Sequence, residues 1–243
     1  MLVDEQGKFV SARTSPRLLG VSIQWEAGGF RVAAGAAGSF WLPKRPKASA
    51  LRCVQIWRDE VQALVIAEGS AWFSQYLGRP VDLVYQPPQA LRPIKRGGTG
   101  PFDLVSFADA YPLLLCSDSS LRDLNRHSTE PIGMRRFRPN VVINGAKAYD
   151  EDCWESVQLG SGAFYVPKLC DRCVMTTVDE TTGQRGKEPL KALARLRRWN
   201  GKVWFGANLV PTDGGHLRVG DVLTVQRRRE HPAGPGWASR ERR

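Results

Sequence analysis

The chain has 243 residues, of which 42% are hydrophobic and 24% are charged. This length and composition are typical of a globular protein with one large or two small domains. No apolar run approaches the ~20 residues of a membrane-spanning helix. Residues 1–5 lack the basic region and apolar run of a secretion signal, so we expect a cytoplasmic protein.

The formal net charge is +11, from 35 Lys and Arg against 24 Asp and Glu. Residues 227–243 contribute +4 of this excess, because they hold six Arg and two Glu. The same segment is rich in Pro and Gly, which predicts a disordered basic tail. Since the remaining chain is only moderately basic, nucleic-acid binding is a weakly supported alternative.

The first third of the chain consists of short apolar segments separated by turn residues. This pattern predicts strands over 2–3, 8–10, 19–25, 30–34, 52–57, 61–66 and 81–85. A helix is predicted over 70–77, because Gly78 stands where helices commonly end. Residues 86–101 are rich in Pro and Gly and predict a linker or an active-site loop.

The rest of the chain continues the β pattern. Strands are predicted over 111–116, 138–144, 154–159, 162–166, 174–178, 204–210 and 217–225. One helix follows a Ser119 or Ser120 cap, and a basic amphipathic helix covers 189–199. The predicted fold is therefore mainly β with a few helices. Its lobes are 1–86 and 102–226, joined by the linker 87–101 and followed by the tail 227–243.

The five cysteines lie at positions 53, 116, 153, 170 and 173, an odd number with one close pair. Cys53 and Cys116 stand beside apolar residues and are expected to be small buried hydrophobes. Cys170 and Cys173 form the sequence Cys-Asp-Arg-Cys, which needs a separate interpretation.

A CxxC pair is compatible with half of a zinc site, a redox dithiol or a metal–thiolate site. Structural zinc is disfavoured, because there is no second CxxC and the three histidines are scattered. A redox dithiol normally opens a helix, whereas a strand is predicted over 174–178. Arg172 and Lys168 favour a thiolate, which binds soft metals. On these grounds, inert cysteines and a metal-binding thiolate remain equally open.

Several motifs, in their order along the chain, resemble the MOSC family. They are residues 107–115 with the helix up to 125, 134–144, 170–179, 188–191 and 218–221. Residues 7–18 resemble the β-barrel domain that precedes MOSC in the amidoxime-reducing-component and YcbX-type branch. The resemblance covers nearly all of residues 1–226. It implies a MOSC β-barrel-like domain over 102–226, preceded by a smaller N-terminal β-barrel domain over 1–86.

The resemblance also implies a cofactor, namely molybdenum on a pyranopterin dithiolene with a protein cysteine as a further sulfur ligand. The cysteine directly after Arg is the ligand in that motif, which here is Cys173. The cofactor-binding residues implied are Arg138, Asn140, Asp171 and Arg172. Asp109 would approach the molybdenum and relay protons. The resemblance also implies pyridoxal phosphate binding, but only as a property associated with the family as a whole.

The sequence departs from the family pattern at two points. The family begins with a strand bearing a Lys-Ser motif and an Asp-Arg-x-Trp segment, whereas this chain starts just after that point. We therefore expect the N-terminal barrel, as written, to be incomplete at its start. The C-x₄-C-x₂-C spacing of an iron–sulfur module is absent, so a separate flavin or iron–sulfur protein is expected to donate the electrons.

The predicted function is a molybdenum-dependent oxidoreductase that reduces N-hydroxylated compounds such as hydroxylamino bases and amidoximes. The predicted catalytic residues are Cys173 and Asp109, with Cys173 as the metal ligand. The alternative is a non-catalytic cofactor-binding or sulfur-carrier protein in which Cys173 carries a persulfide.

Overall fold

The computed structural model describes residues 1–48, 50–94, 103–179, 182–230 and 234–235. They form two compact units. The first contains the described residues of 1–92 together with 182–183, and the second contains the described residues of 93–179 and from 184 onward. The predicted linker 87–101 spans the boundary between the units, and its residues 95–101 lie outside the described ranges. Most of the predicted tail, 231–233 and 236–243, lies outside them too.

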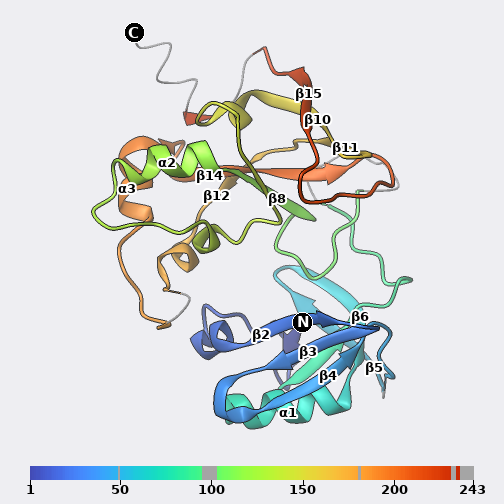
Figure 1. The fold of residues 1–243 in the computed structure, drawn as a ribbon. Helices are drawn as coiled ribbons and strands as arrows, with labels where there is room; N and C mark the ends of the chain where they lie inside the picture. Colours follow the sequence, from blue (N-terminus) through green and yellow to red (C-terminus); the bar gives the residue numbers. More distant parts are fainter. Residues whose placement is uncertain (49, 95–102, 180–181, 231–233, 236–243) are drawn as a thin grey trace. The chain divides into compact units, whose positions relative to one another are not determined.

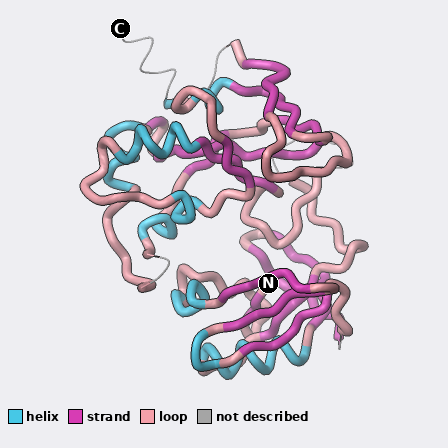
Figure 2. Tube along the Cα trace, in the orientation of Figure 1, coloured by secondary structure: helices cyan, strands magenta, loops and turns pink. Residues whose placement is uncertain are grey.

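The described residues contain fifteen strands and three α-helices, which confirms a mainly β fold with a few helices (Figure 2). No helix among them is both long and apolar enough to span a bilayer.

The described part of the first unit contains two antiparallel sheets, one α-helix and two short 3-10 helices (Figure 1). The four-stranded sheet has the order β1-β7-β6-β5, and the three-stranded sheet has the order β2-β3-β4. The elements are β1 (Leu2–Val3), η1 (Pro16–Gly20), β2 (Ser22–Glu26), β3 (Gly29–Ala33), η2 (Gly35–Ala37), β4 (Ser39–Pro43), β5 (Ala50–Ile56), β6 (Asp59–Val65), α1 (Ala67–Leu77) and β7 (Asp82–Tyr85).

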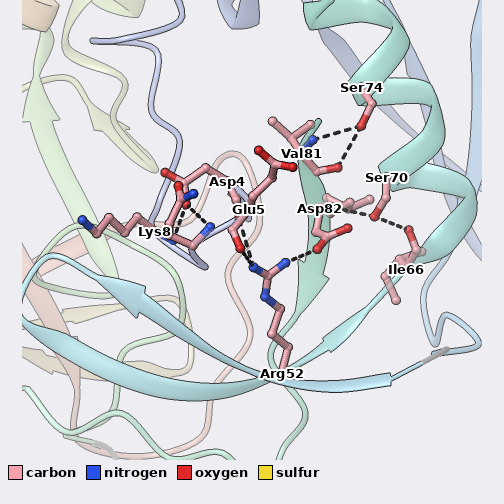
Figure 3. Close-up of polar contacts among 11 residues, drawn as sticks. Asp4, Glu5, Lys8, Arg52, Ile66, Ser70, Ser74, Val81 and Asp82 are labelled. Atoms are coloured by element: carbon pink, nitrogen blue, oxygen red, sulfur yellow. Dashed lines mark hydrogen bonds and ion pairs between the residues drawn. The ribbon is translucent and has the colours of Figure 1, made fainter. Parts of the chain in front are cut away.

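Helix α1 packs against β7 and β4, and apolar residues of both sheets fill the core around it. Phe73 of α1 meets the ring of Phe40 of β4 edge-on in this core, to which Val32 of β3 also belongs. Two serines on the helix add polar contacts, because Ser70 and Ser74 bond to backbone groups at Leu83 and Val81 (Figure 3). The helix is therefore held to β7 by both hydrophobic burial and hydrogen bonds.

Arg52 joins the N-terminal turn to this sheet. Its guanidinium forms an ion pair with Asp82 and donates to the carbonyl oxygens of Asp4 and Glu5 (Figure 3). The Asp4 carboxylate accepts the backbone N–H of Lys8 at 2.8 Å and thereby closes the turn. The predicted turn between residues 3 and 8 is thus present.

The second unit is built on an eight-stranded sheet whose main path is β15-β10-β11-β14-β8-β9, with β12 and β13 also paired to β14. Strands β8 and β9 pair in parallel, and the other strand pairs described in this unit are antiparallel. The elements are β8 (Leu113–Ser117), α2 (Asp118–Asn125), η3 (Met134–Phe137), β9 (Val141–Ile143), η4 (Asp150–Cys153), β10 (Trp154–Leu159), β11 (Gly162–Tyr165), β12 (Leu169–Asp171), η5 (Val174–Thr177), α3 (Leu190–Leu196), β13 (Arg198–Trp199), β14 (Lys202–Pro211) and β15 (Leu223–Arg228).

Strand β14 separates two apolar clusters. Leu115, Trp204 and Ala207 belong to a cluster formed mainly by strand residues. Phe205 belongs to the other cluster, in which it packs with residues of α2 and α3. Neighbouring side chains of one strand point to opposite faces, so one face of β14 packs against the helices and the other packs in the cluster of strand side chains.

Several strand predictions were wrong in bounds or type. The predicted strand over 174–178 is the 3-10 turn η5, and the one over 138–144 shrinks to β9 because Arg138 has a φ of 53°. Residues 16–20 form η1, so β2 starts at Ser22. Strands β4 and β12 were not predicted, and β15 runs to Arg228, two residues into the predicted tail.

The amphipathic helix predicted over 189–199 stops at Leu196, since the chain turns at a buried ion pair. Arg197 donates to Asp152 at 2.7 Å, and both side chains are under 5% exposed. The guanidinium also lies 4.1 Å from the centre of the Tyr149 ring. A buried arginine held on two sides cannot continue a solvent-facing helix surface. The pair therefore fixes where α3 ends and β13 begins.

Glu151, beside this ion pair, is fully buried. Its carboxylate accepts a hydrogen bond from Ser120 at 2.8 Å. Burial raises the pKa of Glu151 to about 7, against the opposing effect of the Ser120 hydrogen bond. The native state therefore keeps a proton on Glu151 over a pH range in which the unfolded chain has lost it.

We predict that Glu151→Gln removes part of the pH dependence of stability. A carboxyl whose pKa is raised by folding stabilises the native state below its ordinary pKa, and this contribution is lost as pH rises to about 7. Between pH 5 and 8 the free energy of unfolding of the unmodified protein should fall by about 2 kcal/mol more than that of the variant. Urea unfolding at several pH values measures the difference. Glu130→Gln, at an exposed position, is the control, and parallel curves for all three proteins would contradict the assignment.

Candidate functional site

The Cys-Asp-Arg-Cys segment lies where β12 leaves the sheet. Cys170 is half-buried in β12, whereas Cys173 is exposed and directly precedes η5. The five cysteines, all within the described residues, form no disulfide. The two members of the CxxC pair thus have different environments: Cys170 faces the protein, and the Cys173 thiol is accessible from solvent.

The backbone around Cys173 is held on both sides. Before it, the N–H of Arg172 donates to the carbonyl of Val203 in β14 at 2.9 Å. After it, the carbonyl of Cys173 accepts the backbone N–H and the hydroxyl of Thr176, at 3.1 and 3.0 Å. An accessible thiol on a fixed backbone is suited to bind a soft metal or to act as a nucleophile.

Arg172 makes its contacts inside the protein. Its Nη1 donates to the sulfur of Cys170 at 2.8 Å, and its Nη2 donates to the carbonyl of Phe137 at 2.7 Å. Its Nε is buried and has no hydrogen-bond partner among the described residues. Burial raises the pKa of Cys170, the Arg172 charge lowers it, and the charges of Asp171 and Asp109 raise it further.

Asp171 is engaged in ion pairs. Its two carboxylate oxygens accept from Lys168 at 2.7 Å and from Lys202 at 2.8 Å. Burial alone would raise the pKa of Asp171, but the hydrogen bonds from the two lysines outweigh it and lower the pKa to about 2. Both ammonium groups also lie near the Trp204 ring. This carboxylate ties β12 to β14 at the edge of the site.

Arg138 and Asn140 lie between η3 and β9. Arg138 is exposed and ends η3 in the left-handed region. Asn140 is also exposed, and it bonds twice to Leu114: its Oδ1 accepts the Leu114 N–H at 2.9 Å, and its own N–H donates to the Leu114 carbonyl at 2.9 Å. Its side chain therefore holds the start of β9 against β8.

Asp109 lies in an irregular segment before β8 and is exposed. It is close enough to Cys170 for its charge to act on that thiol. Of the predicted residues, Asp171 and Arg172 follow Cys170 directly, and Arg138 is brought to them by the bond between Arg172 and Phe137. The structure thus gathers segments near residues 109, 138 and 172 that are far apart in sequence.

Arg136 was not predicted to act at this site. Its Nε donates to the carbonyl of Thr176 at 2.8 Å, and its Nη2 donates to the carbonyl of Glu188 at 3.0 Å. It also lies 3.4 Å from the carboxylate of Asp179. Arg136 therefore supports η5, the turn that follows Cys173. The sequence shows only three nearby arginines and does not reveal which of them points inward.

Two family models match the two parts of the chain. Residues 103–224 match the MOSC domain, and residues 1–80 match the MOSC N-terminal beta barrel domain. A solution structure of a Bordetella bronchiseptica protein matches with a TM-score of 0.33 and 20% identity, over 36% of this chain and 71% of that chain.

Curated relatives match over almost the whole chain. Mitochondrial amidoxime-reducing component 1 of Homo sapiens is 30% identical, over 92% of this chain and 71% of the relative. The Mus musculus protein of the same name is 33% identical, over 92% and 70%. Mitochondrial amidoxime reducing component 2 of Macaca fascicularis is 32% identical, over 92% and 71%. The chain therefore belongs to the MOSC-domain family, with a MOSC N-terminal beta barrel domain preceding its MOSC domain.

Proposed function

We propose that this protein is a molybdenum-cofactor-dependent oxidoreductase that reduces N-hydroxylated compounds such as amidoximes and hydroxylamino bases. The observation that carries the proposal is the accessible Cys173 thiol, held on a fixed backbone in a chain that is 30–33% identical to proteins named amidoxime-reducing components. The family membership supports the class of cofactor, and the names of the relatives support the class of substrate.

The side chains around Cys173 have the chemistry that this cofactor requires. A thiolate is a soft donor and suits a soft metal centre. The exposed guanidinium of Arg138 and the buried, unpartnered Nε–H of Arg172 are donors for an anionic group. We therefore assign Cys173 as the metal ligand, with Arg138, Asn140 and Arg172 around the cofactor. Asp171 would act at a distance, because Lys168 and Lys202 occupy its carboxylate.

The bound cofactor would supply the two-electron reduction. Converting N–OH to N–H consumes two electrons and two protons and releases one water. The exposed carboxyl of Asp109 is the group we assign to deliver protons to the substrate oxygen and nitrogen. The electrons would come from a separate flavin or iron–sulfur protein.

The second candidate function is a sulfur carrier with a persulfide on Cys173, and it rests on the same exposed thiol. Mass spectrometry of the native protein distinguishes the two, since a persulfide adds the mass of one sulfur to Cys173. The cytoplasmic location stays a prediction, because the relatives are named as mitochondrial proteins.

We predict that Cys173→Ala abolishes both molybdenum binding and N-reduction. The purified protein should hold molybdenum near one equivalent per chain, and the variant should hold little, because its thiolate ligand is gone. Metal analysis and benzamidoxime reduction with a chemical electron donor measure the two properties. Cys53→Ala, which removes an exposed thiol from β5, is the matched control. Stoichiometric molybdenum in Cys173→Ala would refute the ligand assignment.

We further predict that Asp109→Asn lowers the turnover number by roughly 10²-fold or more while molybdenum content stays unchanged. The amide keeps the size of the side chain but cannot deliver a proton. Steady-state kinetics with benzamidoxime, paired with metal analysis, test this. Asp118→Asn, at an exposed position in α2, should behave like the unmodified protein. A turnover number in Asp109→Asn equal to that of the control would show that the protons take another route.

A further inference from the structure

The guanidinium of Arg172 is held by protein groups on three sides. Its two terminal nitrogens donate to the sulfur of Cys170 at 2.8 Å and to the carbonyl of Phe137 at 2.7 Å. Its Cζ lies 5.5 Å from the centre of the Phe137 ring, which stacks on the Phe205 ring with the two centroids 4.0 Å apart. Cys170 and Arg172 stand two residues apart at the end of β12, so extended backbone points both side chains to the same side.

This single side chain connects the two segments that carry the proposed cofactor residues. Arg172 directly precedes Cys173, and its backbone is bonded to Val203 of β14. Phe137, whose carbonyl it holds, directly precedes Arg138. One guanidinium therefore links the residue before the proposed metal ligand to the residue before the proposed cofactor-binding arginine.

We infer that Cys170 is a positioning residue: its sulfur fixes the orientation of the Arg172 guanidinium, and through it the spacing between Cys173 and Arg138. This inference rests on the proposed function, in which Cys173 and Arg138 hold the cofactor. Arg172 is then chiefly a brace within the protein, with only its Nε left to face a ligand.

The chemistry of arginine explains why this position suits it. A planar guanidinium presents several N–H groups in a rigid fork and can bond to a sulfur and a carbonyl at once, whereas a lysine ammonium has no such fixed geometry. Removing the Cys170 sulfur would leave Nη1 without this acceptor in a half-buried place, and the guanidinium would reorient to find another. A serine at position 170 keeps an acceptor but places it closer to the backbone. It should therefore restore the brace only in part.

The test compares molybdenum-loaded variants in two measurements. The first is the rate of molybdenum release from the holoprotein, and the second is the position of its sulfur-to-molybdenum absorption band. Outer residues that orient a metal ligand typically contribute 10–100-fold to metal affinity. We expect Cys170→Ala to release molybdenum about tenfold faster and to shift the band. Cys170→Ser should be intermediate, Arg172→Lys should resemble Cys170→Ala, and Cys53→Ala should match the unmodified protein.

A double mutant tests whether Cys170 acts through Arg172. If it does, Cys170→Ala should add nothing to the release rate in a chain that already carries Arg172→Ala. The inference would be overturned if the effects of the two substitutions on the release rate multiplied in the double mutant. It would also be overturned if the Cys170→Ala holoprotein had the same release rate and absorption band as Cys53→Ala. Should Cys170→Ala fail to fold, as judged by thermal melting, Cys170→Ser carries the same test.

The outcomes separate this inference from the proposed function. An unmodified protein without molybdenum would refute the proposed function and the inference together. An unmodified protein that holds molybdenum, with Cys170 variants indistinguishable from it, would refute only the positioning role of Cys170.

Discussion

The second unit depends on the bulge in strand β14 at Gly206. The backbone there has a φ of 80°, and a Cβ at this position would lie 2.6 Å from the carbonyl of Leu115 and 2.8 Å from the sulfur of Cys116. Only glycine fits such a conformation and so close an approach. The bulge also shifts the register with β12, which pairs Leu169 with Ala207 and Asp171 with Trp204. Cys170 lies between these two pairs, so the irregularity in β14 determines where the CxxC segment leaves the sheet.

The same bulge explains how one strand supports two cores. Regular alternation would place Trp204 and Ala207 on opposite faces, yet both belong to the strand cluster, while Phe205 packs with the helices. An extra residue on one strand changes the alternation at that point. Phe205 is thereby placed under Phe137, whose carbonyl and ring hold Arg172. The geometry near Cys173 is thus continuous with the packing of the hydrophobic core.

Charged groups near the site divide into those that build it and those that face outward. Four charged side chains make contacts between η3, η5, β12 and β14, namely those of Arg136, Asp171, Arg172 and Lys202. Arg138 and Cys173 remain exposed. A net positive charge in the sequence therefore says little about how many cations are available to a ligand, because neighbouring arginines in one run point to different surroundings.

The sequence alone determined the fold class and the family, and it singled out the CxxC segment as the candidate site. These follow from local patterns, such as apolar alternation, turn residues and ordered motifs, which are written in consecutive residues. Its errors share a cause. The segment 174–178 has strand-like composition but forms η5, in which the carbonyls of Val174 and Thr176 accept from the Thr177 hydroxyl and the Arg136 guanidinium. Cys53 was expected to be buried beside Val54, but alternation along β5 places it outside.

Only the tertiary structure decided what each predicted residue touches. Asn140 falls within the strand predicted over 138–144, yet it precedes β9, is exposed and bonds to Leu114 of β8. The difference between Cys170 and Cys173 also arises only in the fold: identical in type and three residues apart, one accepts a bond from Arg172 and the other faces solvent. The pairing of β12 with β14 sets this difference, because it joins residues more than thirty positions apart that no local pattern relates.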